Sequence, residues 1–157
     1  MSQVDELLKQ DEFDIYSNPH VEQDKLKVIA TIFSKCDYLE ILDYCKLAKC
    51  TSKQCWNNYV SIIDYMAYPQ KLKGIPTLFE FLKDINWPIF EKVIKVLESY
   101  PRKDILPAVE YYVAKAHEED DDMWISGILI LAQRLNIQSS EFKNKEQYDY
   151  FQCNDIY

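Results

Sequence analysis

Glycine is almost absent from this chain, and its absence narrows the range of possible folds. The 157 residues contain two glycines, Gly74 and Gly127. Tight turns between strands and phosphate-binding loops both depend on glycine, because it adopts left-handed backbone angles at little steric cost. A β-sheet or a nucleotide-binding fold is therefore disfavoured, and the sequence predicts an all-α protein.

The spacing of apolar residues divides the chain into three expected regions. Apolar side chains that recur every three or four residues predict N-terminal helices over residues 21–68 and paired helices over residues 75–135. The aromatic-rich segment 139–157 is expected to form a helix that caps the last pair. The length favours a single domain, 1–157, in which we expect about eight or nine helices.

Two helices of the N-terminal region are expected to begin with capping boxes. Asp37 is followed three residues later by Glu40, and Thr51 is followed three residues later by Gln54. In such a pair each side chain bonds the backbone N–H of the other residue, which satisfies donors that a helix start leaves unpaired. The helix behind the first box is expected to bury Leu39, Leu42 and Cys45.

The region 75–135 contains two similar helical pairs. The expected helices are 75–84 and 88–100 in the first pair, and 104–118 and 118–136 in the second. Pro88 is expected in the first turn of its helix, where a missing N–H costs nothing. Counted from Pro76 and Pro107, matching apolar residues are Leu78, Phe81 and Leu82 in the first pair, and Val109, Tyr112 and Val113 in the second. Two such pairs predict a short α-solenoid of HEAT type.

Acidic residues outnumber basic ones, and they gather in two places. The formal net charge is −8, and residues 1–24 hold seven acids against a single base, Lys9. Consecutive acids also run from Glu118 to Asp122. A protein that binds nucleic acid needs clustered lysine and arginine to neutralise phosphates. Nucleic acid is therefore disfavoured as a partner, and a basic protein is favoured.

Neither a secretion signal nor a membrane span is indicated. Residues 1–14 are acidic and lack the basic and apolar regions of a secretory signal. The longest apolar run, Met123–Ala132, falls well short of the roughly 20 residues that span a bilayer. We therefore expect a soluble, cytoplasmic protein with no membrane partner.

The cysteines and histidines do not form a recognisable metal-binding pattern. Cys45, Cys50 and Cys55 are spaced five residues apart, whereas zinc ligands usually come as pairs with two to four residues between them. We expect all five cysteines of the chain to be reduced and structural. His117 precedes the acids, but a helical carboxylate site of the Glu-x-x-His type would need Glu where Ala114 stands.

The sequence also lacks the parts of a catalytic site. A serine or cysteine nucleophile needs a neighbouring base, and the two glycines belong to no phosphate-binding motif. An enzyme is therefore disfavoured, and we assign no catalytic residue, cofactor site or metal site. A metal-dependent hydrolase that uses the acids at 118–122 is the least favoured alternative.

The prominent acids and aromatics also have structural explanations. Acids at 118–122 would suit the N-terminal end of a helix dipole, where they act as caps. The three tryptophans, Trp56, Trp87 and Trp124, lie on or beside inward-facing stripes and are expected in the core. The aromatic tail is therefore a better source of exposed apolar contacts than the tryptophans.

Two short elements resemble a known family. The segment Ile85-Asn86-Trp87-Pro88, followed by Asp121-Asp122-Met123-Trp124 and an apolar helix, resembles a small bacterial HEAT-like family, domain of unknown function 5071. The resemblance extends from about Lys71 to Leu135. Small helical proteins of this kind are similar to immunity proteins of bacterial toxin systems, including contact-dependent growth inhibition. The resemblance thus implies a HEAT-like fold and a role as a toxin inhibitor.

Charge, size and resemblance together favour an immunity protein. We expect it to bind and neutralise a basic toxin domain, such as a nuclease, as a monomer that enters a heterodimeric complex. The alternative is a general helical-repeat scaffold that binds other proteins without a toxin partner. The expected partner-binding residues are Glu118, Glu119, Asp120, Asp121, Asp122, Asp11, Glu12, Asp14, Tyr148 and Tyr150.

Overall fold

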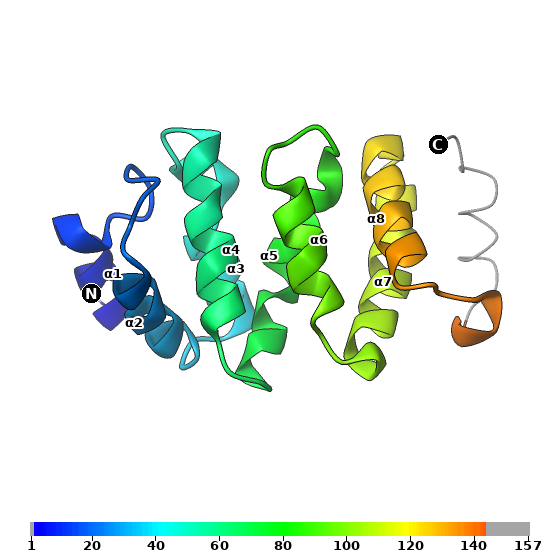
Figure 1. Cartoon of the computed structure of the whole chain (residues 1–157), viewed down its shortest axis with the longest axis horizontal. Coiled ribbons are helices and arrows are strands. Elements are labelled where there is room, and N and C mark those ends of the chain that lie inside the picture. The colour runs from blue at the N-terminus through cyan, green and yellow to red at the C-terminus, as the bar shows by residue number, and fades with distance from the viewer. Residues whose placement is uncertain (1, 144–157) are drawn as a thin grey trace. The chain divides into compact units, whose positions relative to one another are not determined.

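The computed structural model describes residues 2–143, and within this range the chain is all-α, as predicted (Figure 1). The α-helices are α1 (Gln3–Leu8), α2 (Gln23–Phe33), α3 (Tyr38–Tyr44), α4 (Trp56–Tyr65), α5 (Ile75–Glu80), α6 (Phe90–Glu98), α7 (Arg102–Glu118) and α8 (Asp122–Arg134). Short 3-10 helices lie between them: η1 (Asp11–Phe13), η2 (Leu47–Lys49), η3 (Lys53–Cys55), η4 (Gln70–Gly74), η5 (Phe81–Lys83) and η6 (Ser139–Glu141). None of the described helices is long and apolar enough to cross a bilayer. The HEAT-type arrangement stays a prediction.

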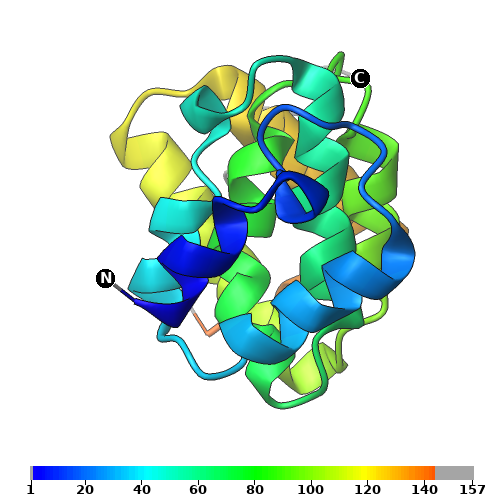
Figure 2. The ribbon, with the colours of Figure 1, turned by 90° about the vertical axis from the view of Figure 1, so that its left-hand side faces the viewer.

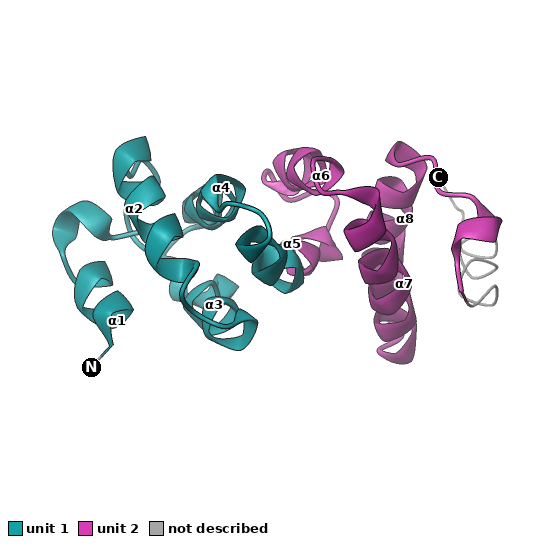
Figure 3. Cartoon of the chain, turned by 90° about the horizontal axis from the view of Figure 1, so that it is seen from below, with its two compact units in different colours: residues 1–77 teal, residues 78–157 magenta. Residues whose placement is uncertain are grey.

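The chain divides into two compact units, residues 1–77 and 78–157 (Figure 3). The boundary falls inside α5, close to residue 75, where the sequence predicts the start of the paired helices. Each unit has its own buried side chains and is described separately.

Unit 1 is built on the packing of α2 against α4, and α1 lies beside α2 (Figures 1 and 2). Ile29 and Phe33 of α2 are fully buried, as are Tyr59 and Ile63 of α4. Their spacing of four residues puts each pair on one face of its helix. The core of unit 1 therefore follows from the helical periodicity of the sequence.

The capping prediction is confirmed for one helix start and wrong for the other. Asp37 and Glu40 form the expected reciprocal pair at the start of α3. At the second position the helix begins at Lys53 without a side-chain cap, because the N–H and hydroxyl of Thr51 both bond the carbonyl of Tyr16. The tertiary contact takes the groups that would have formed the box.

The burial predicted for α3 is wrong at Leu39, whose side chain is 59% exposed. The fully buried residue of this helix is Ile41, and Cys45 after the helix is buried as expected. Leu42 is half-buried, so the buried face of the short helix is shifted towards Ile41 and Cys45 and away from Leu39.

Unit 2 has an aromatic core between α5, α7 and α8. The ring of Phe79 stacks on Tyr112 with centroids 4.4 Å apart, and Trp124 lies 5.9 Å from Tyr112. The Trp124 indole donates a buried hydrogen bond of 2.8 Å to the carbonyl of Phe79. The six predicted inward positions, Leu78, Phe81, Leu82, Val109, Tyr112 and Val113, are all buried. Trp56 and Trp124 are buried as expected, whereas Trp87 is half-buried.

Several helix boundaries around unit 2 differ from the predicted ones. Pro88 lies in the turn before α6, which begins at Phe90, so its predicted place in the first helical turn is wrong. Pro107 lies within α7, which begins at Arg102 and not at Asp104. The predicted helix 75–84 is divided into α5 and η5.

Both glycines mark close contacts. A Cβ placed on Gly127 of α8 would overlap the backbone carbonyl oxygen of Leu82, and one on Gly74 would overlap the side chain of Ile63. Neither glycine has a positive φ. Their role is therefore to let neighbouring segments approach, since a hydrogen occupies the space that a methyl group would fill.

Gly127→Ala should lower the free energy of unfolding by about 1–3 kcal/mol, because the new methyl group meets a backbone carbonyl that cannot rotate away. The gain in helix propensity, about 1 kcal/mol, acts in the opposite direction and is the smaller effect. Urea unfolding followed by circular dichroism measures the difference. Ser126→Ala, at the preceding buried position, is the control and should change stability by less than about 1 kcal/mol. A Gly127→Ala protein as stable as the parent would contradict the close contact.

Candidate functional site

The first candidate site is the connection between α7 and α8, residues Glu118–Asp122, called here the acidic joint. Its backbone is fixed by two hydrogen bonds, from Asp120 N–H to the His117 carbonyl (3.0 Å) and from Asp121 N–H to the Ala116 carbonyl (2.9 Å). Asp120 has a φ of 51°, in the left-handed region. This pattern is a Schellman motif, in which glycine is the usual residue at the left-handed position. The chain instead places a charged residue there.

Two acids of the joint stabilise the start of α8. The Asp121 carboxylate accepts a hydrogen bond of 3.0 Å from the Trp124 N–H and caps the helix. Asp122 is the first residue of α8, where a negative charge favours the helix dipole. The structural role predicted for these acids is therefore present at Asp121 and Asp122.

The other three acids of the joint have no such role. Glu118 and Glu119 lie at the C-terminal end of α7, where the helix dipole disfavours negative charge. Glu118, Glu119 and Asp120 are exposed. Within residues 2–143, no lysine or arginine forms an ion pair with them. Their charges therefore lie in solvent at a local cost in stability.

Exposed apolar side chains flank the acidic joint on both helices. Tyr111 of α7 is 60% exposed and Met123 of α8 is 50% exposed. Tyr111 and Glu118 are seven residues apart, which places them on the same face of α7. The surface around the joint thus combines negative charge with apolar area.

The predicted N-terminal acids differ from the acidic joint. Glu12 is exposed but forms an ion pair of 3.6 Å with Lys25, and Asp11 is exposed at the start of η1. Asp14 is half-buried and accepts hydrogen bonds of 3.1 Å from the N–H groups of Tyr16 and Ser17. Asp14 therefore shapes its own turn. The predicted contact residues Tyr148 and Tyr150 lie outside the described residues.

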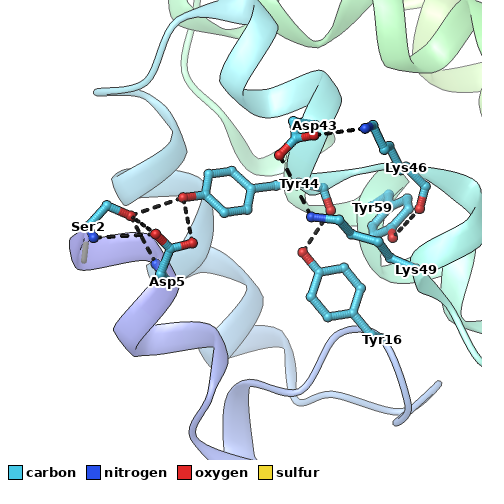
Figure 4. A network of polar contacts seen from close by, with 8 residues as sticks. All are labelled: Ser2, Asp5, Tyr16, Asp43, Tyr44, Lys46, Lys49 and Tyr59. Carbon is cyan, nitrogen blue, oxygen red and sulfur yellow. Dashed lines mark hydrogen bonds and ion pairs between the residues drawn. The ribbon is translucent and has the colours of Figure 1, made fainter.

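A second candidate site in unit 1 was not predicted from the sequence. Ser2 and Asp5 cap α1 reciprocally, and the Tyr44 hydroxyl donates to Asp5 at 3.0 Å (Figure 4). The hydrogen bond from Ser2, followed by that from Tyr44, lowers the pKa of Asp5, so that its carboxylate is charged at neutral pH. Burial raises the pKa of Tyr44, which keeps its hydroxyl protonated as a donor. The spacing of Ser2 and Asp5 signals the cap, but nothing in the sequence signals the contact with Tyr44.

This network borders a pocket of about 400 Å³ in unit 1. Its lining residues are Asp5, Leu8, Lys9, Tyr16, Tyr44 and Lys49. Lys49 projects between the two tyrosines, with its ammonium nitrogen 5.8 Å from the Tyr16 ring centroid and 5.6 Å from the Tyr44 ring centroid (Figure 4). Its carboxylate partner is Asp43 at 3.8 Å. The pocket is thus lined by two aromatic rings with a lysine ammonium group between them.

The described cysteines are free thiols that stabilise the core. Cys36, Cys45 and Cys55 are buried, and Cys50 is half-buried. Burial raises the pKa of the Cys45 thiol well above its usual range, and it also raises that of Cys36. A raised pKa lowers the thiolate fraction and hence the reactivity. Among residues 2–143, no three His, Cys, Asp or Glu side chains are grouped to hold a metal ion.

Comparison with known proteins places most of the chain in a family. A family model described as Domain of unknown function (DUF5071) matches residues 56–149. The match begins at the first residue of α4, fifteen residues before Lys71, where the resemblance was expected to start. It contains the acidic joint, whereas the lining of the pocket lies before it. No curated protein and no solved structure matches the chain.

Substitution of single acids in the acidic joint should show which of them contribute to the free energy of unfolding. Asp121→Ala should lower the free energy of unfolding by about 1 kcal/mol through loss of the cap, and Asp121→Asn should retain most of it. Asp120→Gly should change stability by less than about 0.5 kcal/mol, because glycine suits the left-handed position. Asn136→Gly, at the other left-handed residue with φ of 52°, is the uncharged control. Urea unfolding compares the four variants, and an Asp120→Gly loss as large as that of Asp121→Ala would contradict the assignment.

Proposed function

We propose that this chain, which belongs to the DUF5071 family, is an immunity protein that binds a basic bacterial toxin domain and neutralises it. The acidic joint carries the proposal. Three of its carboxylates are exposed, lack ion-pair partners within residues 2–143, and occupy positions that the helix geometry disfavours. Local charges that cost stability are typical of functional surfaces, because a partner compensates them on binding.

The proposed mechanism is binding without catalysis. Carboxylates of Glu118, Glu119 and Asp120 would take the place of nucleic-acid phosphates and pair with lysine or arginine in the toxin. A nuclease domain suits this role because its own substrate is a polyanion. The complex would be a heterodimer that forms in the cytoplasm and blocks the toxin active site, as in contact-dependent growth inhibition.

Charge alone would not give a tight complex. An exposed ion pair contributes about 0.2–1 kcal/mol, so three such pairs supply at most about 3 kcal/mol. A nanomolar complex needs about 12 kcal/mol. Burial of apolar side chains must supply much of the difference, and Tyr111 and Met123 are the exposed apolar residues beside the joint. The acids would chiefly raise the association rate and select a basic partner.

A second candidate function is a general scaffold that binds proteins without a toxin partner. The observation that favours it is an apolar pair on α3, Tyr38 and Leu39, which are 52% and 59% exposed. This surface belongs to unit 1 and contains no part of the acidic joint. A scaffold would bind its partner through this surface in cells that lack any toxin gene.

Co-expression with the toxin domain encoded beside the gene of this chain should restore growth, and the purified proteins should form a 1:1 complex. The variant Glu118→Gln/Glu119→Gln/Asp120→Asn should associate about tenfold more slowly at low salt, because it loses the charges that steer the encounter. Stopped-flow fluorescence or surface plasmon resonance measures the rate.

The control is Glu6→Gln/Glu22→Gln/Asp24→Asn, a variant at three exposed positions outside the expected partner-binding residues, which also removes three carboxylates and changes the net charge from −8 to −5. Its association rate should stay within about twofold of the parent rate. Equal slowing by both variants would show that net charge and not the acidic joint steers binding. No growth rescue, or no toxin gene beside this one, would contradict the proposed function.

A further inference from the structure

The pocket of unit 1 has the size of a small-molecule site and is open to solvent on the side of Lys9 and Lys49, which are exposed. Its volume of about 400 Å³ lies within the range of roughly 300–1,000 Å³ that is common for such sites. Its walls come from α1, from the loop after η1, from the end of α3 and from η2. All of these elements belong to unit 1 and precede the residues matched by the family model.

The aromatic walls of the pocket are held in place by contacts behind them. The Tyr16 hydroxyl donates a hydrogen bond of 2.8 Å to the Tyr44 carbonyl. The Tyr44 ring stacks on Phe33 with centroids 5.7 Å apart, and the edge of Tyr16 meets Tyr59 at 6.1 Å. A ligand would therefore not have to order these side chains, which lowers the entropic cost of binding.

The charged groups of the pocket favour a ligand with one negative charge. Asp5 already accepts hydrogen bonds from the Ser2 N–H, the Ser2 hydroxyl and the Tyr44 hydroxyl. Lys49 has three donor hydrogens, and its carboxylate partner Asp43 is 3.8 Å away and is shared with Lys46 at 3.0 Å (Figure 4). The Lys49 ammonium can therefore donate to a further anion.

The net charge of the pocket lining favours a monoanion over a dianion. The lining contains two lysines and one aspartate, a formal sum of +1. A dianion such as a phosphate monoester would be opposed by Asp5 and, behind Lys49, by Asp43. Leu8 and the two tyrosine rings offer apolar and aromatic contacts to the rest of the ligand.

We propose that this pocket binds a small aromatic monocarboxylate, with its ring against Tyr16 and Tyr44 and its carboxylate on the ammonium group of Lys49. The inference does not depend on the proposed toxin partner, because the pocket contains no residue of the acidic joint. It assigns a ligand site to the part of the chain that the family model does not match.

Titration of the full chain with phenylacetate, followed by NMR, tests the proposal. Phenylacetate should shift the ring signals of Tyr16 and Tyr44 saturably and show cross-relaxation to them. Phenylacetamide, which has the same shape without the charge, should bind about two- to fivefold more weakly, because Lys49 is exposed and solvent screens its ion pair. Cyclohexylacetate, which keeps the charge but not the aromatic ring, should also bind more weakly.

Variants of Lys49 and Asp43 should change the affinity for phenylacetate in opposite directions. Lys49→Met keeps the length of the side chain and should weaken phenylacetate binding about two- to fivefold, because the lost ion pair is exposed to solvent. Lys53→Met, at another exposed lysine outside the pocket, is the matched control and should leave binding unchanged. Asp43→Asn removes the competing carboxylate and should strengthen binding about two- to threefold. A loss of fold does not produce such an increase.

Several results would overturn the proposal. These are the absence of saturable shifts at up to about 10 mM phenylacetate, equal affinity for the acid and the amide, and equal affinity for cyclohexylacetate. Unchanged binding by a folded Lys49→Met protein would do the same. If Lys49→Met does not fold, the comparison of acid and amide on the parent protein decides the question.

Discussion

The close contact between α8 and the backbone of Leu82 is the constraint on which unit 2 depends. Gly127 permits it, because any larger residue would overlap the Leu82 carbonyl. The contact brings the Trp124 indole to the Phe79 carbonyl, where a buried hydrogen bond forms. An unpaired indole N–H at this depth would cost about 1–3 kcal/mol. The backbone N–H of Trp124 is in turn held by Asp121. The core thus fixes the start of α8 and, through it, the acidic joint.

Unit 1 depends on a different set of interactions, which hold a long irregular segment in place. Between α3 and α4 the chain forms only short 3-10 helices, so many of its carbonyls lack helical partners. Side chains take their place as donors: Tyr16 bonds the carbonyl of Tyr44 at the end of α3, Tyr59 that of Lys46, and Trp56 that of Leu47. These bonds position Tyr44 and Lys49, because both lie on the segment that they hold. The pocket is therefore a consequence of the side-chain hydrogen bonds that unit 1 makes to its backbone carbonyls.

The parts of the structure that the sequence predicts are those set by local periodicity. The buried positions from Leu78 to Val113 follow a spacing of three and four residues, which is a property of each helix alone. The errors occur where distant residues compete for the same groups. Thr51 leaves its predicted capping box for the carbonyl of Tyr16, 35 residues away. The Tyr44 hydroxyl reaches Asp5 across 39 residues, so no local pattern could indicate the pocket. The acidic joint could be identified from its composition, but only the structure separates Asp121 from the acids without a structural role.

The two candidate sites differ in what the family match implies for them. Because the acidic joint lies inside residues 56–149, its backbone motif and the contact beneath it belong to the matched part of the chain. The pocket depends on α1 and on the segment up to Lys49, all of which precede the match. A related chain that shares only the matched residues would therefore retain the frame of the joint and lose the pocket. Binding at the joint would then be a property of the family, whereas binding at the pocket would be particular to chains that also carry this N-terminal part. The two proposed sites also differ in chemistry, since one presents negative charge in solvent and the other a lysine between aromatic rings.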